Sequence, residues 1–386
     1  MFQTVSLGSV SKYISEKVTV EDIALIDYVS TENLLHGKGG LSLASKLPQS
    51  GKVTKYQKND VLVSNIRPYF KKIWYADRSG GASNDVLVVR STSSDIDSRY
   101  LYYVLADDRF FEYSTTSSGG SKMPRGDKMQ IMKYPLFLPS LDEQMKIADT
   151  LRTIDEKIEL NQKMNETLEQ MGQALFRHYF ITNPDVEKWD TVLLGDYLVV
   201  ERGLSYKGAF LSDNPTDTPM INLGSFSTNG TYNAANIKYY NGEFKQRSIV
   251  SPTDLVVANT DMTQDRVVLG SVLSAPDLAE KMIYSHHVYG LKDLKLSKEF
   301  VFYLLKRPQF RERAQGFATG TTVLFLPSKA ITKLEFRLPD DTTLARFDTV
   351  ARNIHCQIEL LRKENEQLID LRDTLLPRLI SGKVRI

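Results

Sequence analysis

Residues 138–180 read LPSLDEQMKIADTLRTIDEKIELNQKMNETLEQMGQALFRHYF, and residues 338–380 read LPDDTTLARFDTVARNIHCQIELLRKENEQLIDLRDTLLPRLI. From Asp142 to about Tyr179 only Gly172 interrupts a run of good helix formers. Apolar residues recur in steps of four and three, which predicts two long helices that bury an apolar seam. The predicted seam comprises Ile147, Leu151, Ile154, Ile158, Leu168, Leu175, Phe347, Ile354, Ile358, Leu361, Leu368 and Leu375.

Three seam positions are polar: Asn161, Asn165 and Asn365. A buried seam asparagine often fixes the register of paired helices. The other interpretation, that these positions are solvated, stays open. At about 1.5 Å per residue each helix would be roughly 55 Å long, so it would act as a spacer as well as a core.

The two helices belong to a longer internal repeat. Residues 99–178 align without a gap on residues 299–378, and 19 of the 80 positions are identical, against roughly 5 expected from average composition. Outside this stretch, TVSLG at 4–8 matches TVLLG at 191–195. The chain is therefore a tandem duplication, and two copies of a recognition unit imply a target with two halves.

Each copy begins with a mixed α/β module. Matched strands are predicted at Val61–Asn65 and Leu255–Asn259, after the turn residues Asp60 and Asp254, with a further strand at Asp85–Val89. Short helices are predicted at Tyr100–Leu105 and Phe300–Leu305, ahead of the loops Thr115–Asp127 and Gly316–Thr322. We expect modules at 1–140 and 190–339, a long helix at 141–181, a linker at 182–189, and a second long helix with a C-terminal tail at 340–386. The fold class is mixed α/β, with two modules separated by antiparallel long helices that form a coiled coil with pseudo-twofold symmetry.

Bulk composition permits nucleic-acid binding without demanding it. The net charge is +2 and 25% of residues are charged, so a polyanion binder would need its basic residues on one face. The single cysteine, Cys356, excludes a disulfide framework and fits a reducing compartment. No signal peptide or apolar run of membrane-spanning length is present, and we expect a cytoplasmic protein.

No catalytic constellation is recognisable in the sequence. The glycine clusters do not link a strand to a helix, so they do not form a nucleotide-binding loop. The pair His286-His287 lacks a second ligand cluster at metal spacing, and we expect Cys356 to be a packed thiol. We therefore predict no catalytic residue, no metal and no cofactor in this chain, and a binding function instead.

Polar loops with basic and aromatic residues are the binding candidates. Arginine, asparagine and glutamine can read base edges, while lysine and backbone amides hold phosphates. The predicted DNA-binding residues are Ser64, Asn65, Arg67, Tyr69, Lys71, Lys72, Ser121, Lys122, Arg125, Asn259, Thr260, Gln264, Arg266, Thr319, Thr321 and Thr322. We expect Arg67, whose backbone Pro68 keeps out of the helical region, to read a base. The lysines should hold phosphates. The alternative that Arg67 pairs with an internal acid stays open.

The ordered set of motifs resembles the DNA-specificity subunit of a type I restriction–modification system. The resemblance rests on LPSLDEQ at 138–144, LFRHYF at 175–180, Trp189, and LLPRLISG at 375–382, and it covers the whole chain. The segment DVLVSNIRPYFKK at 60–72 is also similar to segments of such subunits. PDDTT at 339–343 departs from the family's second Pro-x-x-Glu-Gln, which leaves the capping of the second helix open.

The resemblance implies that each module reads one half of a split, asymmetric DNA site. It also implies that the helices set the spacing and dock two methyltransferase subunits, which carry S-adenosylmethionine. ATP-dependent restriction subunits could join the complex. The alternatives are a specificity subunit of a methylation-only or phage-defence complex, a self-contained nuclease or methyltransferase, and a coiled-coil scaffold without a DNA role.

Overall fold

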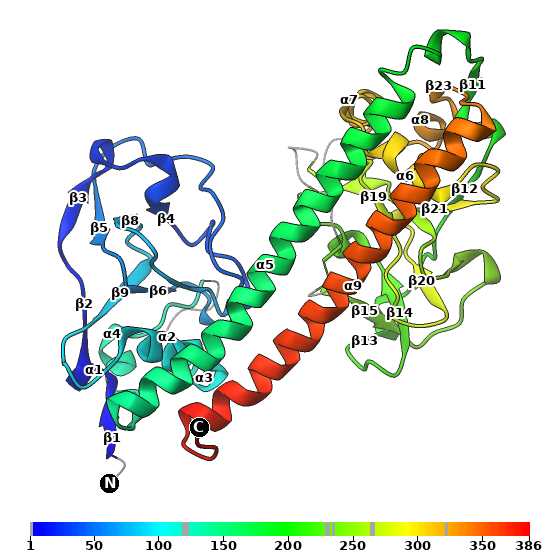
Figure 1. Ribbon diagram of the computed structural model, residues 1–386. Coiled ribbons are helices and arrows are strands. Elements are labelled where there is room, and N and C mark those ends of the chain that lie inside the picture. The colour runs from blue at the N-terminus through cyan, green and yellow to red at the C-terminus, as the bar shows by residue number, and fades with distance from the viewer. Residues whose placement is uncertain (1–2, 118–122, 228–231, 234–235, 263–266, 321–322) are drawn as a thin grey trace. The chain divides into compact units, whose positions relative to one another are not determined.

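The computed structural model describes residues 3–117, 123–227, 232–233, 236–262, 267–320 and 323–386. The chain divides into two compact units, residues 1–161 with 364–386 and residues 162–363 (Figure 1). The division falls within the two long helices, α5 (Leu141–Phe180) and α9 (Asp341–Ile380), so each helix contributes to both units. The helices are therefore parts of the two cores.

In the first unit two strands join the beginning of the module to its end. β1 (Gln3–Ser6) pairs antiparallel with β10 (Pro135–Leu138). One four-stranded sheet has the order β2 (Ser11–Tyr13), β9 (Val86–Ser91), β6 (Val61–Ser64), β7 (Ile73–Tyr75). A second has the order β3 (Lys17–Thr19), β5 (Lys52–Tyr56), β8 (Gly80–Ala82), β4 (Tyr28–Val29).

Four shorter helices complete this unit: α1 (Leu7–Val10), α2 (Ser98–Ala106), α3 (Asp108–Thr116) and α4 (Lys128–Ile131). Asp97 accepts hydrogen bonds from the amides of Arg99 and Tyr100 and so caps α2. Buried residues of α2 and α3 form one core with the sheet and with both long helices, including Tyr100, Phe110, Leu151 and Leu376.

The second unit repeats this arrangement. β11 (Thr191–Leu193) pairs with β23 (Glu335–Arg337), as β1 does with β10. The sheet β12 (Val199–Arg202), β21 (Val288–Lys292), β17 (Leu255–Ala258), β19 (Val272–Ser274) corresponds to β2-β9-β6-β7. The helices are α6 (Lys298–Lys306), α7 (Pro308–Phe317) and α8 (Lys329–Thr332). The duplication inferred from the sequence is thus visible in the strand order.

The second unit also contains a five-stranded sheet where the first has four strands. Its order is β13 (Leu211–Ser212), β15 (Lys238–Tyr240), β14 (Thr218–Ile221), β20 (Met282–Tyr284), β16 (Ile249–Val250). A short antiparallel pair joins β18 (Thr260–Asp261) to β22 (Leu324–Phe325).

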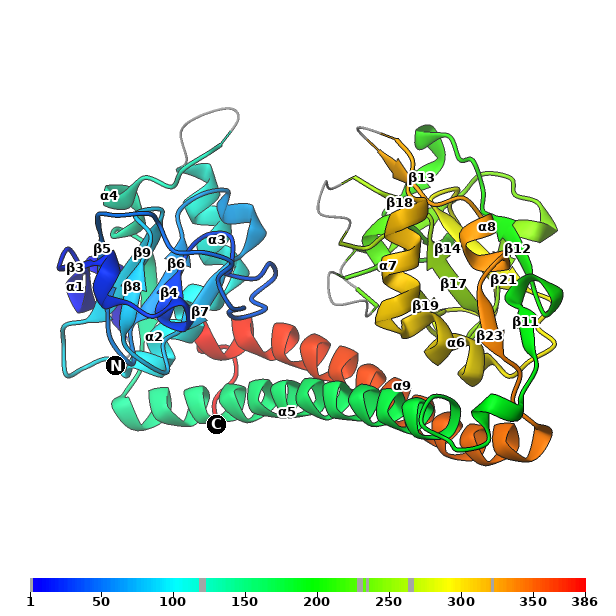
Figure 2. The same cartoon turned by 90° about the horizontal axis from the view of Figure 1, so that it is seen from above.

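The long helices pack antiparallel within each unit, and both views show them side by side (Figure 1, Figure 2). In the first unit Arg372 of α9 donates a hydrogen bond to Asp155 of α5, and Asn161 of α5 donates one to Asn365 of α9. The second contact lies six residues later in α5 but seven residues earlier in α9, so the helices run antiparallel. In the second unit Phe176 and Phe180 of α5 pack around Phe347 of α9. The mixed α/β fold with antiparallel long helices, predicted from the sequence, is confirmed.

The seam is apolar at its ends and polar in its middle. Half of the predicted seam is buried, namely Ile147, Leu151, Ile154, Ile158, Phe347 and Ile354, and the other half is partly buried. The Asn161 amide donates to Asn365 Oδ1 at 2.9 Å, and both side chains are buried. A pair bonded in this way supports the register-fixing interpretation for these two positions.

Local features explain where α9 begins and why α5 contains a glycine at position 172. Asp340 accepts hydrogen bonds from the amide and the hydroxyl of Thr343, so it caps α9 where the family motif is missing. At Gly172, within the last ten residues of α5, an added Cβ would collide with the Tyr303 ring. Glycine thus permits the close packing of α6 on α5.

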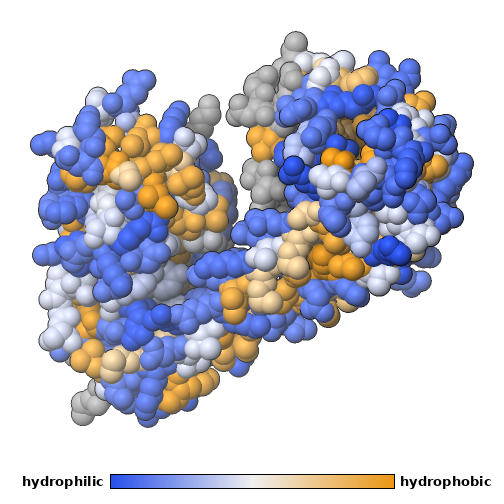
Figure 3. Space-filling model, turned by 45° about the horizontal axis from the view of Figure 1, so that its top comes forward, coloured by the Kyte–Doolittle hydropathy of each residue, from blue (hydrophilic) through white to orange (hydrophobic). Residues whose placement is uncertain are grey.

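Surface polarity is mixed, and Figure 3 shows a face on which hydrophilic side chains predominate around separate hydrophobic patches. Cys356 is exposed, so the expectation of a packed thiol is wrong. Its neighbour His355 is the partly buried residue, because adjacent helix positions point in different directions. No helix in the described part of the chain is long and apolar enough to cross a membrane.

Candidate nucleic-acid interface

Three segments of the first unit meet at the end of β6. The amide of Asn65 donates to the carbonyl of Asp85, and the amide of Gly126 donates to the carbonyl of Asn65. The amide of Arg67 donates to the carbonyl of Pro124 at 2.8 Å. Arg125 and Asp85 add an ion pair at 3.0 Å across the same junction. Asn65 is therefore the backbone joint between segments that are distant in the sequence.

The second unit contains the same joint at Asn259. Its amide donates to the carbonyl of His287 at 3.0 Å, and its carbonyl accepts from the amide of Leu326 at 2.8 Å. Beyond the joint, Thr260 pairs with Phe325 and Asp261 with Leu324. At the same place in the first unit, Ile66 pairs with Arg125. The loops predicted to bind at matched places thus share one frame but differ in side chains.

The joint residues themselves face inward. Ser64, Asn65, Asn259 and Thr260 are all buried. The side-chain amide of Asn259 donates to the carbonyl of His286, and Thr260 Oγ1 lies 2.9 Å from His287 Nδ1. Their burial does not support the direct DNA contacts predicted from the sequence. These side chains hold the loops in place, because a buried polar group is stable only when it is hydrogen-bonded inside the protein.

The segment after Asn65 forms a constrained turn. Arg67 and Lys71 both have left-handed backbone conformations, with φ of 49° and 52°, and enclose the 3-10 turn Pro68–Phe70. The sequence prediction that Pro68 keeps Arg67 out of the right-handed helical region is met by this left-handed conformation. A neighbouring loop braces the turn, since the amides of Gly37 and Lys38 donate to the carbonyls of Phe70 and Lys71.

Arg67 has no acidic partner among the described residues. Its guanidinium carbon lies 5.9 Å from the centre of the Phe70 ring, and within the described ranges no acceptor bonds its Nε. The alternative in which an internal acid neutralises Arg67 thus finds no support in this part of the chain. The prediction that Arg67 reads a base remains a prediction.

The two lysines of this segment are placed differently. Lys71 forms a 2.8 Å ion pair with Asp108 and is about one-third exposed. Lys72 is buried, and its ammonium donates to the carbonyl of Thr31 at 2.5 Å. Burial lowers the pKa of Lys72, and nearby Glu32 partly opposes that effect. As placed here, Lys72 braces the module from within, contrary to the phosphate contact expected from its position in a basic run.

Sequence reasoning missed Lys38. Its buried ammonium lies 3.0 Å from Asp108 and 3.4 Å from Asp373 of α9, so it ties the constrained turn to the long helix. Burial would raise the pKa of Asp108, but hydrogen bonds from Lys71 and Lys38 lower it below its usual value. No local sequence signal could have found this contact, because Asp373 lies 335 residues away.

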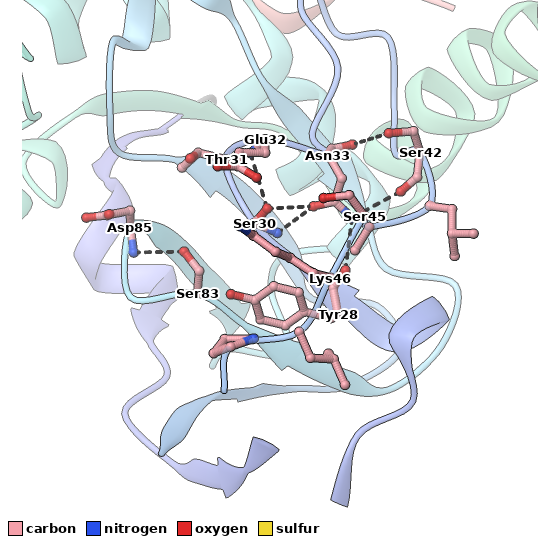
Figure 4. Close-up of a pocket in the computed structure, with 14 residues that line it drawn as sticks. Tyr28, Ser30, Thr31, Glu32, Asn33, Ser42, Ser45, Lys46, Ser83 and Asp85 are labelled. Atoms are coloured by element: carbon pink, nitrogen blue, oxygen red, sulfur yellow. Dashed lines mark hydrogen bonds between the residues drawn. The ribbon is translucent and has the colours of Figure 1, made fainter. Parts of the chain in front are cut away.

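A hollow of about 370 Å³ lies beside the joint. Figure 4 shows Ser30, Glu32, Ser45, Lys46 and Asp85 around it, with a hydrogen bond from the Asp85 amide to Ser83. The lining is polar and mixed in charge, which suits a wet surface more than an apolar ligand.

The remaining predicted residues fall into two groups. Arg125, Tyr69 and Thr319 are exposed. Six lie outside the described residues: Ser121, Lys122, Gln264, Arg266, Thr321 and Thr322. Within the described ranges no three His, Cys, Asp or Glu side chains are grouped to hold a metal ion.

Comparison with known proteins assigns this architecture. The sequence profile described as "Type I restriction modification DNA specificity domain" matches residues 2–170. Residues 2–170 belong to this family. The second unit, which the profile does not cover, has the same strand order and the same joint as the first. The resemblance expected from the sequence is confirmed.

Type I specificity subunits are similar to this chain over nearly its whole length. The "Type I restriction enzyme HindI specificity subunit" of Haemophilus influenzae is 23% identical, covering 98% of each chain. The "Type I restriction enzyme MjaVIII specificity subunit" of Methanocaldococcus jannaschii is also 23% identical, covering 100% of this chain and 93% of the relative. The crystal structure of a type I restriction–modification S subunit from M. genitalium has the same fold, with a TM-score of 0.56, 15% identity and coverage of 98% and 96%.

Proposed function

We propose that this chain is the DNA sequence-recognition subunit of a type I restriction–modification complex. One observation carries the proposal: the same backbone joint occurs in both units, at Asn65 and Asn259, but different side chains follow it. A duplicated frame with divergent loops is what a protein needs to read two different half-sites. The first unit presents Arg67, Tyr69 and Arg125 at its joint, and the second presents Met262 and Thr319.

The long helices dock the methyltransferase subunits in this proposal. Four apolar side chains on them are about half exposed: Leu160, Met171, Leu360 and Leu371. They form two pairs related by the repeat, since Leu160 corresponds to Leu360 and Met171 to Leu371. Each unit contains one member of each pair. Two equivalent apolar surfaces favour two methyltransferase subunits per chain.

The chain itself is non-catalytic in this proposal. The methyltransferase subunits bind S-adenosylmethionine and methylate the DNA, and restriction subunits, where present, join that complex. With a net charge of only +2, the isolated chain makes few phosphate contacts and binds DNA weakly at physiological salt. The methyltransferase subunits supply the remaining contacts.

Reconstitution with the neighbouring methyltransferase tests the proposal. We expect sequence-specific binding and methylation of a two-part site by the complex, and neither by the chain alone. Replacing Leu160 and Leu371 by aspartate should remove one methyltransferase subunit, which native mass spectrometry can count. Ile26→Asp, at another exposed apolar residue, serves as the matched control. Methylation by the isolated chain would instead identify a self-contained enzyme.

A further inference from the structure

Beyond its joint each unit exposes a large apolar side chain, in addition to Met123 and Val323 on the facing segments. Tyr69 lies four residues after Asn65 and is 49% exposed, and Met262 lies three residues after Asn259 and is 62% exposed. The residues before them, Pro68 and Asp261, are buried. Single exposed apolar side chains are common on protein surfaces, and these two stand out because they recur at corresponding places on anchored backbone.

The backbone under Tyr69 is fixed in advance. Arg67, Lys71 and Lys38 are non-glycine residues with φ near 50° to 60°, and each such conformation costs about 1–3 kcal/mol unless surrounding contacts enforce it. Here the enforcing contacts are the two hydrogen bonds from the 37–38 amides and the Lys38–Asp108 ion pair. The ring therefore loses little freedom on meeting a partner.

The backbone before Met262 is fixed by other means. Asp261 pairs with Leu324 across β18 and β22. Its carboxylate accepts hydrogen bonds from the amides of Val268 at 2.7 Å and Leu269 at 3.2 Å. Met262 thus extends from an anchored residue, as Tyr69 does, although the anchoring bonds differ.

Base reading by hydrogen bonds is open to tyrosine through its hydroxyl but not to methionine. Methionine has no hydrogen-bond donor, so it cannot recognise a base edge as arginine or asparagine does. Within the described residues the Tyr69 hydroxyl has no hydrogen-bond partner, and the ring packs edge-on against Phe70 at 4.8 Å. Apolar side chains on DNA-binding surfaces act instead as wedges that partly unstack a base step.

We propose that Tyr69 and Met262 are matched wedge residues, each inserted against a base step of the half-site that its unit reads. The proposal rests on the DNA-recognition function proposed above. Flexible pyrimidine–purine steps are easily unstacked, so a wedge adds sequence preference at positions without base-edge hydrogen bonds. In the first unit Arg67 and Arg125 hold the flanking backbone or bases while the wedge acts; Arg125 remains 59% exposed beside its ion pair with Asp85.

The test uses the complete methyltransferase complex and duplexes with 2-aminopurine placed at each position of the cognate site. We expect a fluorescence increase at one step in each half-site. Tyr69→Ala should abolish the signal in one half-site, and Met262→Ala the signal in the other. Affinity should fall roughly tenfold or more for each, while Tyr69→Phe and Met262→Leu retain signal and affinity.

Each variant serves as the control for the other half-site, and Ile26→Ala controls for loss of an exposed apolar group. If the wild-type complex binds its site specifically but no step becomes fluorescent, or if the alanine variants leave signal and affinity unchanged, the wedge is refuted and the recognition function stands. If the wild-type complex binds no specific site, the recognition function fails and the wedge fails with it.

Discussion

Replacing Arg90 by alanine should destabilise the first unit far more than the matched change destabilises the second. The Arg90 guanidinium donates two hydrogen bonds, of 2.6 and 2.7 Å, to the Asp60 carboxylate, and the Asp60 side chain is only 1% exposed. The amide of Gln57 is the other donor to this carboxylate among the described residues. Without Arg90 a buried charge would keep a single hydrogen bond.

Breaking a buried ion pair by removing one partner costs about 3–5 kcal/mol. Because about a quarter of the Arg90 side chain reaches solvent, water can partly replace it, and we expect about 3 kcal/mol. The second unit supplies the control: Lys292 stands 3.6 Å from Asp254, whose side chain is 26% exposed. Lys292→Ala should cost about 1 kcal/mol.

Hydrogen exchange in peptides covering β6 and β9 measures this difference within the intact chain. A loss of about 3 kcal/mol corresponds to a roughly 100-fold larger population of the open state, whereas peptides of β17 and β21 should be unaffected by Arg90→Ala. Equal effects of Arg90→Ala and Lys292→Ala would refute the reasoning. So would a change confined to peptides outside the first unit.

Four further outcomes are expected. Arg67→Ala should cost about 1–3 kcal/mol at the cognate site and relax discrimination at one base pair; equal loss on every member of a degenerate site library would contradict this. Lys72→Met should lower the midpoint of thermal unfolding without changing the salt dependence of DNA binding, because its ammonium is buried; a salt slope reduced by about one unit would restore its phosphate role. Exchanging residues 190–339 for those of another such subunit should change one half-site only, as methylation mapping would reveal. Burial against aromatic rings lowers the pKa of His355, so the unfolded chain binds the proton first and stability should fall as pH drops below about 6.5; denaturation at several pH values should give a flatter profile for His355→Leu.

Much of the fold could be predicted because its signals are local or periodic. The heptad spacing and the repeat predicted the long helices, and Val61–Asn65 and Leu255–Asn259 emerged as strands one residue shorter. The matched joint could be expected in outline, since asparagine ends both strands in the sequence. Its hydrogen bonds to Asp85 and His287 could not, because they depend on how separate segments meet.

The candidate site was less predictable because charge in a sequence does not reveal burial. Lys71 and Lys72 are adjacent lysines in one basic run, yet one lies at the surface and the other donates to the Thr31 carbonyl. The left-handed conformation of Arg67 likewise has no residue-type signal, since arginine disfavours it and only the surrounding bonds enforce it. Lys38 was overlooked because its partner is distant in the chain.

The pairing of β1 with β10, and of β11 with β23, has a consequence for how new specificities arise. Paired strands lie about 4.8 Å apart, so the chain enters and leaves each module at nearly the same point. Whatever lies between those two strands can change in length or sequence without displacing the helix that follows. A gene encoding such a protein can therefore acquire a foreign module through two crossovers in the segments that encode the paired strands, and the inherited helices need not co-evolve with the newcomer.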